Sequence, residues 1–327
     1  MKGERLIVLL MVTFAWLGCS DRNAPEVSLR VTRCATMPAP RASAAACSLN
    51  GKGYVFGGRN QNGTYLNDLW QYDPTTDSWT AMSPFPGKAR VNAVMTAYNG
   101  ALYVGLGFSG EKVYVDSCYL RDLWRYTPSD GTWTALRVSP YRNTVRGVPI
   151  VSGNRIYVLY SAGWSYTRDV IYYDCISDRW DSIPYNEHRA ESCFAGAGAN
   201  CGGRTFFGTG LNRYNLRQWY EADIQADRWS KRSSIPGKGR ELCACCATDR
   251  HVYLFGGRYF GGDQTGGEVF AQYLRYSVAN DEWERCGDMP CGRGENMIAF
   301  IIDGKAYFGL GENEQGTIHN TLYRIED

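Results

Sequence analysis

The fold is decided by a stretch that reads YVFGGRNQNGTYLNDLWQYDPTTDSW at residues 54–79. It begins with an aromatic residue and a glycine pair, continues through a second hydrophobic segment and ends at a tryptophan. Tryptophans recur at the matching place along the chain: Trp79, Trp133, Trp180, Trp229 and Trp283. Repetition of this kind indicates that the 327 residues are built from copies of one supersecondary unit.

The two hydrophobic elements of this stretch each occur six times. Copies of the first element are 54–58, 103–107, 157–161, 206–210, 253–257 and 307–311. Copies of the second are 67–73, 121–127, 168–174, 217–223, 271–277 and 320–326. An arginine precedes each first element, at intervals of 47 to 53 residues: Arg41, Arg90, Arg142, Arg189, Arg240 and Arg293. Asn-Gly and similar pairs before most first elements favour tight hairpins, so we expect short antiparallel strands.

The repeat resembles the kelch repeat in its YVFGG element, its DLWQYD element, and the later Trp79 and Arg90. The resemblance covers roughly residues 31–327. It implies an all-β fold, a six-bladed kelch β-propeller with four antiparallel strands per blade, here called a to d from the channel outward. Small residues such as ASAAAC (42–47) suit strand a, because it lines the crowded centre of the ring.

The sixth repeat ends the chain without a fourth strand. The segment VTRCATMPAPR (31–41) aligns without a gap on WERCGDMPCGR (283–293), which contains strand d of the fifth repeat. We therefore predict that the N-terminal strand completes blade 6. Closing the ring in this way removes a free sheet edge and joins both ends of the chain.

The first 19 residues resemble a bacterial lipoprotein signal, with Lys2 and Arg5 before the apolar run 6–17 and Cys19 after a glycine. We expect export to the bacterial outer membrane or periplasm, lipidation of Cys19, and contact with the membrane through that anchor only. A plain cleaved signal peptide is the alternative. Residues 20–30 are expected to be a polar tether and residues 31–327 the propeller.

The net charge argues against a nucleic-acid partner, and the spacing of cysteines and histidines argues against a metal site. The net charge is +2 without a basic block, so we expect no nucleic-acid partner.

Eleven cysteines follow Cys19, an odd number that cannot all pair within one chain. Cys243, Cys245 and Cys246 are expected to be small core residues of a strand a, because no second Cys/His cluster has zinc-like spacing. His188, His251 and His319 are too scattered for a copper site, and we predict no metal and no cofactor.

The resemblance implies that the d-to-a and b-to-c loops surround the channel mouth, where ligands of the family often bind. Two residues after the repeated arginines come Ser43, Asn92, Thr144, Glu191, Leu242 and Glu295. The b-to-c loops add Arg59, Trp164, Tyr166, Arg213, Arg258, Tyr259 and Glu312. The predicted ligand-binding set is Arg41, Arg59, Arg90, Asn92, Arg142, Arg146, Trp164, Arg189, Glu191, Arg240, Arg258, Arg293 and Glu295.

Two interpretations of that set stay open at this point. The repeated arginines either bind a ligand or bond neighbouring loops, whereas Glu191, Glu295, Arg146 and Trp164 are not explained by the repeat. A ring of arginines with a few carboxylates suits a small anion, a sugar or an acidic peptide.

Two functions follow from these interpretations. The first is a cell-envelope module that binds a protein or glycan ligand at the channel mouth. The alternative is a sugar mutarotase, because exported kelch proteins include the N-acetylneuraminate epimerases. In that case Glu191 or Glu295 would be the catalytic acid or base, and Arg189 or Arg293 would hold the substrate carboxylate. Whether the protein is an enzyme is left open by the sequence.

Overall fold

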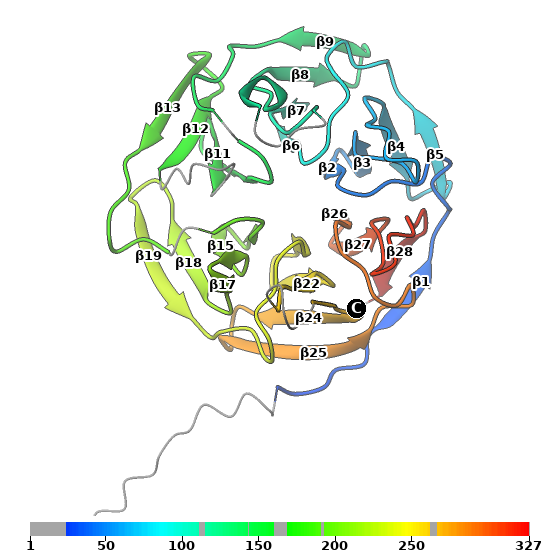
Figure 1. The fold of residues 1–327 in the computed structure, drawn as a ribbon, viewed down its shortest axis with the longest axis vertical. Coiled ribbons are helices and arrows are strands. Elements are labelled where there is room, and N and C mark those ends of the chain that lie inside the picture. The colour runs from blue at the N-terminus through cyan, green and yellow to red at the C-terminus, as the bar shows by residue number, and fades with distance from the viewer. Residues whose placement is uncertain are drawn as a thin grey trace, which may run out of the picture.

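Each repeat folds into a four-stranded antiparallel sheet, and six such sheets surround a central channel (Figure 1). The computed structural model describes residues 24–110, 115–142, 144–159, 169–190, 193–261 and 267–326. The predicted signal peptide, Cys19, Trp164 and Glu191 lie outside these residues. The part of the chain that is described contains no helix long and apolar enough to cross a membrane.

The two inner strands of each blade are five-residue segments, except that β20 has four residues. The a strands of blades 1 to 6 are β2 (Ala45–Leu49), β6 (Val94–Tyr98), β10 (Val148–Ser152), β14 (Ala197–Cys201), β20 (Ala244–Ala247) and β26 (Ile298–Ile302). The b strands are β3 (Lys52–Phe56), β7 (Ala101–Gly105), β11 (Arg155–Leu159), β15 (Arg204–Gly208), β21 (His251–Phe255) and β27 (Lys305–Gly309). The b strands are buried along most of their length, because neighbouring blades cover both of their faces.

The outer strands contain the second repeated element and the recurring tryptophans. The c strands are β4 (Leu69–Asp73), β8 (Leu123–Thr127), β12 (Val170–Asp174), β18 (Trp219–Asp223), β24 (Gln272–Ser277) and β28 (Leu322–Glu326). The d strands are β5 (Ser78–Ala81), β9 (Thr132–Ala135), β13 (Arg179–Ile183), β19 (Arg228–Arg232), β25 (Glu282–Asp288) and β1 (Arg30–Arg33). Minor elements are β16 (Leu211–Asn212), β17 (Tyr214–Asn215), β22 (Arg258–Tyr259), β23 (Glu268–Val269) and a short 3-10 helix (Asp116–Cys118).

The N-terminal segment closes the ring as predicted. β1 pairs with β28 from Arg30 opposite Glu326 to Arg33 opposite Tyr323, which makes it the outer strand of blade 6 (Figure 1). Farther along, the N–H of Met37 donates to the carbonyl of Asn320 at 2.9 Å, and the Met37 side chain is fully buried. The segment therefore contributes both backbone hydrogen bonds and core packing.

Four of the five recurring tryptophans link their blade to the one before it. The indole N–H groups of Trp79, Trp133, Trp180 and Trp283 donate to carbonyls of the preceding blade's outer segment, at 2.8–3.2 Å. The acceptors are Ala35, Ser83, Arg137 and Ser233. The five tryptophan side chains pack between blades, and four of them also satisfy their one polar group there, whereas the Trp229 indole donates to Asp227 of its own blade at 3.1 Å.

Candidate functional site

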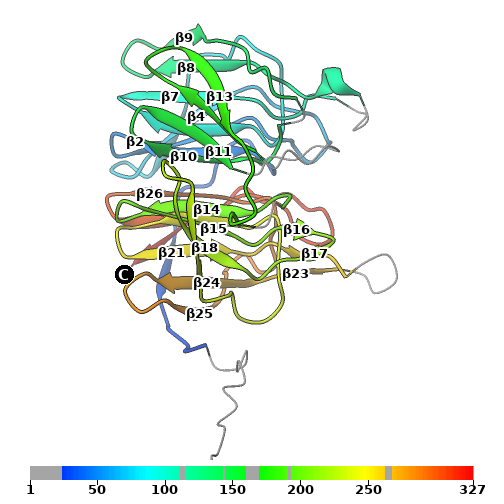
Figure 2. The ribbon, with the colours of Figure 1, turned by 90° about the vertical axis from the view of Figure 1, so that its left-hand side faces the viewer.

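The loops expected at the channel mouth lie together. The d-to-a loops pair with the b-to-c loops through isolated bridges in five blades: Ala42 with Arg59, Val91 with Phe108, Phe194 with Leu211, Glu241 with Arg258, and Glu295 with Glu312. In side view, β16, β17 and β23 of the b-to-c loops lie at one end of the channel axis (Figure 2). Both sets of loops therefore surround the same opening.

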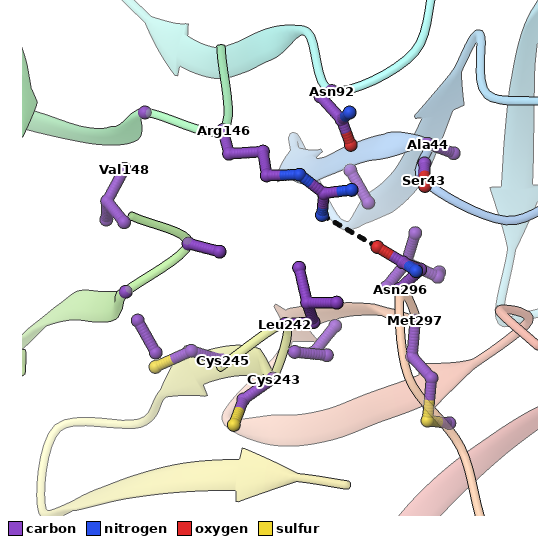
Figure 3. A pocket seen from close by; sticks show the side chains of 18 of the residues that line it. Ser43, Ala44, Asn92, Arg146, Val148, Leu242, Cys243, Cys245, Asn296 and Met297 are labelled. Carbon is purple, nitrogen blue, oxygen red and sulfur yellow. Dashed lines mark hydrogen bonds between the residues drawn. The ribbon is translucent and has the colours of Figure 1, made fainter. Parts of the chain in front are cut away.

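Six residues with a left-handed backbone begin the a strands at this opening. They are Ser43, Asn92, Arg146, Ala195, Leu242 and Asn296, with φ between 52° and 58°. Within the described residues, five backbone N–H···O=C bonds of 2.9–3.2 Å join them from blade to blade. Residues with this conformation are strained unless they are glycine, so the hydrogen bonds must hold them. They line a channel cavity of about 200 Å³ (Figure 3).

These six hydrogen-bonded residues show which positions of the six blades are structurally equivalent. Two residues before its members come Arg41, Arg90, Thr144, Cys193, Arg240 and Gly294. Their equivalence is supported by the carbonyls of Arg41, Arg90, Thr144, Arg240 and Gly294, each of which accepts a hydrogen bond from a glycine N–H of the blade before it. The prediction of six equivalent arginines is therefore wrong for Arg142, Arg189 and Arg293. The d-to-a loops differ in length, so a repeated arginine need not occupy a repeated place.

Arg41 and Arg90 are fully buried and bonded within the scaffold. Each makes a bidentate ion pair with the aspartate just before strand c, Asp68 or Asp122, at 2.7–2.8 Å. Burial alone would raise the pKa of these carboxyls, but the bonds and charges of the arginines outweigh it and hold the pKa of each below its usual value. Neither arginine lines the channel cavity.

The three misaligned arginines also lie away from the channel cavity. Arg189 is buried and bonds Asp227, in the turn between β18 and β19, at 2.7 and 2.8 Å. Arg293 is exposed and donates to the carbonyl of Val269 at 3.0 Å. Arg142 is exposed in a separate surface cavity beside Asp122. The position of Arg189 separates it from Glu295, with which it was expected to share a site.

A cluster of charged side chains occupies the mouth beside blades 5, 6 and 1. Three glutamates with 5–6% exposure form it together with three arginines: Glu241, Glu295, Glu312, Arg59, Arg146 and Arg258. Arg59 pairs with Glu312, and Arg258 lies 3.1 Å from Glu295. We call these six residues the mouth cluster. It joins four of the predicted residues, Arg59, Arg146, Arg258 and Glu295.

Arg146 reaches the cluster from blade 3, across the channel (Figure 3). Its Nη1 donates to Oδ1 of Asn296 at 2.7 Å, and the Asn296 amide in turn donates to Glu312 at 2.9 Å. Its guanidinium lies 5.4 Å from the centre of the Phe194 ring. The predicted residue Asn92 lines the same cavity.

Among the described residues of blades 2 to 4, the equivalent positions are apolar. Val91, Val145 and Phe194 correspond to Glu241 and Glu295, and Phe108 and Leu211 correspond to Arg258 and Glu312. Within the described residues, a ligand at the mouth would therefore meet the mouth cluster on one side of the channel and these apolar side chains on the other.

Burial changes the proton affinities in the mouth cluster. It raises the pKa of Glu241 to about 7, against the opposing charges of Arg146 and Arg258. Burial also raises the pKa of Glu295, against Arg258. Burial lowers the pKa of Arg146 to about 10, although the three glutamates oppose this change. Glu241 can therefore gain or lose a proton near neutral pH.

Glu241 was missed by the sequence argument, and Glu312 was not selected from its loop. The sequence argument selected the residue two positions after each repeated arginine. After Arg240 this is Leu242, one of the six residues with a left-handed backbone, so Glu241 was passed over. One signal in the sequence could have identified Glu241: it places a charge where the first two repeats have the apolar residues Ala42 and Val91.

The cysteines and histidines form no metal centre within the described residues, where no group of three or more His, Cys, Asp or Glu side chains suits a metal ion. Cys243 and Cys245 line the channel cavity (Figure 3). Burial raises the pKa of the Cys243 thiol to about 12, which keeps it protonated at neutral pH.

Comparisons with known proteins agree with the fold. A family model described as the KLHDC2/KLHL20/DRC7 Kelch-repeats domain matches residues 19–210. Kelch-like protein 25 of Xenopus tropicalis is 27% identical over 277 residues, which cover 83% of this chain but only 44% of that protein. The chain thus spans less than half the length of this relative.

Two bacterial relatives and one solved structure are also similar. N-acetylneuraminate epimerase of Yersinia enterocolitica is 28% identical over 278 residues, covering 77% of this chain and 66% of that protein. The Haemophilus influenzae protein of the same name (strain PittEE) is 24% identical, covering 81% and 69%. A solved structure titled "Structure of YjhT" covers 90% of this chain and 99% of its own, with a TM-score of 0.72 and 16% identity.

Proposed function

Because this chain belongs to the kelch-repeat family, we propose that it binds a small carboxylated sugar at the channel mouth. The observation that carries the proposal is the mouth cluster, which gathers three arginines and three buried glutamates from blades 1, 3, 5 and 6. Such a cluster supplies cations for a carboxylate and hydrogen-bond acceptors for hydroxyl groups. A flat protein interface would not need charges at this depth.

Arg146 is the cation best placed to hold the ligand's carboxylate. Arg59 and Arg258 already have glutamate partners, whereas Arg146 is held by the neutral amide of Asn296. Among the described residues, no carboxylate lies within ion-pair distance of Arg146. A ligand carboxylate would therefore relieve the cost of its burial without breaking an ion pair.

The names of two relatives indicate which sugar to test first. Both are called N-acetylneuraminate epimerases, and N-acetylneuraminate carries one carboxylate on a sugar ring. The apolar side of the mouth, with Val91 and Phe194, would then face the less polar part of the ring.

Titration calorimetry tests the binding proposal. We expect N-acetylneuraminate to bind and N-acetylmannosamine, which lacks the carboxylate, to bind at least tenfold more weakly. Arg146→Met should lower the affinity about 10- to 100-fold, as expected for the loss of a charge-assisted hydrogen bond. Arg228→Met, whose side chain is 78% exposed on β19, is the matched control and should leave the affinity unchanged. Equal affinities for Arg146→Met and the native chain would refute the assignment.

A second function, anomer exchange, is favoured by the raised pKa of Glu241, about 7. In this reaction, ionised Glu241 would take the proton of the anomeric hydroxyl while a water molecule at the mouth gives a proton to the ring oxygen. The bond between the anomeric carbon and the ring oxygen breaks as the carbonyl forms, and closure on its other face returns both protons. The exchange needs no oxidant and no second substrate, so acid–base groups suffice.

We further propose that the chain is exported and lipid-anchored at Cys19, as its first 19 residues suggest. Labelling with radioactive palmitate in a bacterial host should mark the native chain and leave Cys19→Ala unlabelled. Equal labelling of both chains, or labelling of neither, would contradict lipidation at Cys19.

A further inference from the structure

Arg240 occupies the same place in blade 5 as Arg41 in blade 1 and Arg90 in blade 2. Its Nη1 donates to the carbonyl of Gly256 at 3.2 Å, as Arg41 does to Gly57 at 3.0 Å and Arg90 to Leu106 at 3.1 Å. The exposed fraction of Arg240 is 1%. All three guanidiniums therefore lie buried beside the start of strand c in their blades.

The carboxylate that neutralises Arg41 and Arg90 is replaced in blade 5. The carbonyls of Asp68, Asp122 and Gln272 each accept an equivalent N–H from the end of strand b, at 3.0–3.2 Å. Gln272 thus stands where the other two blades have aspartate. Within the described residues, no carboxylate lies within ion-pair distance of Arg240, and its Nε has no hydrogen-bond partner.

The surroundings of Arg240 leave its charge largely uncompensated. The Phe270 ring lies 4.1 Å from the guanidinium and supplies only a cation–π contact. Glu268, an acid whose charge acts on Arg240, pairs with Lys238 at 2.6 Å, and Arg285 adds a second positive charge nearby. An arginine stays protonated when buried, so an unpaired one is costly.

Comparison with the other blades makes blade 5 unusual. Blades 4 and 6 have neither member of the pair, with Cys193 and Gln218 in one and Gly294 and Thr321 in the other. Blade 3 has Thr144 in place of the arginine, and its Asp169 accepts the N–H of Tyr185 at 2.9 Å. Among the blades compared, only blade 5 has the buried arginine without an aspartate just before strand c to pair with it.

We propose that blade 5 binds a small monovalent anion, chloride, between the Arg240 guanidinium and the Gln272 amide. The ion takes the place of the Asp68 and Asp122 carboxylates, with the Gln272 NH₂ as a second donor. Gln272 is exposed and lines a surface cavity of about 570 Å³ together with Arg285, which would bring the ion from solvent to the Gln272 amide; Arg240 itself does not line this cavity. This site is separate from the mouth cluster, which does not include Arg240.

Thermal unfolding at constant ionic strength tests the proposal, with sodium chloride replacing sodium gluconate in steps. Chloride that binds only the folded chain should raise the Tm of the native chain saturably, by about 2–4 °C. Gln272→Asp restores the pair of blades 1 and 2 and should remove this response. Gln218→Asp makes the same change at the equivalent place in blade 4, where there is no arginine, and should keep it.

Two further measurements keep the result interpretable. Arg240→Met should also lose the chloride response, which covers the case in which Gln272→Asp folds poorly. Crystals soaked in bromide should show an anomalous peak within ion-pair distance of the Arg240 guanidinium. The proposal is overturned if the native chain shows no chloride-dependent shift, or if Gln272→Asp and the native chain shift in parallel.

Discussion

A chain that begins at Arg41 is expected to lose the cooperative unfolding transition of the whole ring. The deletion removes the four residue pairs between β1 and β28 and the buried side chains of Cys34 and Met37, which pack with residues of blades 6 and 1. It also removes the carbonyl of Ala35 that accepts the Trp79 indole N–H at 3.0 Å. We expect a loss of more than about 5 kcal/mol, comparable to the total stability of many domains.

Thermal unfolding followed by tryptophan fluorescence measures this loss. A chain that begins at Ala24 is the control, because it keeps every N-terminal contact described and should melt like the full-length protein. Met37→Ala is a milder test and should cost about 2–5 kcal/mol, since the side chain is fully buried. If the chain that begins at Arg41 melts with the native Tm, β1 does not hold the ring closed.

Glu241→Gln is expected to slow anomer exchange of N-acetylneuraminate by about 10²- to 10⁴-fold, the usual effect of losing a general base. The substitution preserves size and one acceptor oxygen, and it removes the proton-accepting carboxylate with its charge. Exchange between the α and β forms can be followed by saturation-transfer NMR. Glu282→Gln, an exposed change on β25, is the control and should leave the rate unchanged.

The pH profile separates a catalytic role of Glu241 from a structural one. Because burial raises its pKa to about 7, the ionised form that accepts a proton accumulates as the pH rises through 7. The catalysed rate should rise over that range, and Glu241→Gln should abolish the rise. The effect on stability has the opposite sign: the contribution of a raised carboxyl pKa is complete below about pH 4.5 and is lost as the pH rises through about 7. An unchanged rate in Glu241→Gln would exclude it as the base, while the binding proposal would still rest on Arg146.

Features that repeat along the chain were predictable, and features that depend on loop length were not. The aromatic-glycine and DLWQYD-like elements became strands b and c in every blade, because the alternation and turn residues that specify them are local. Arg41, Arg90 and Arg240 were aligned correctly. Arg189 was misaligned because its d-to-a loop differs in length, so that Cys193 occupies the place of Arg41 while the Arg189 side chain bonds Asp227.

The mouth cluster shows the same limit for function. Glu295, Arg258, Arg59 and Arg146 were named from the sequence. Arg59 and Arg258 belong to the b-to-c loops, and Glu295 and Arg146 are charges that the repeat does not explain. Glu241 was not, since nothing beside it in the chain indicates a shifted pKa. That shift comes first from burial, which outweighs the opposing charges of Arg146 and Arg258, and the nearby charge of Glu295 adds to it.

The sequence by itself determined the strand order, the six blades and the closure of blade 6 by residues 31–41, because each follows from residues close together in the chain or from a direct match of two segments. Only the tertiary structure decided which arginines are neutralised in the scaffold and which charges meet at the mouth. Burial and ion pairing depend on side chains from different blades, such as Arg59 with Glu312. Their distances are set by loop geometry around the channel, and the spacing of residues in the chain does not record it.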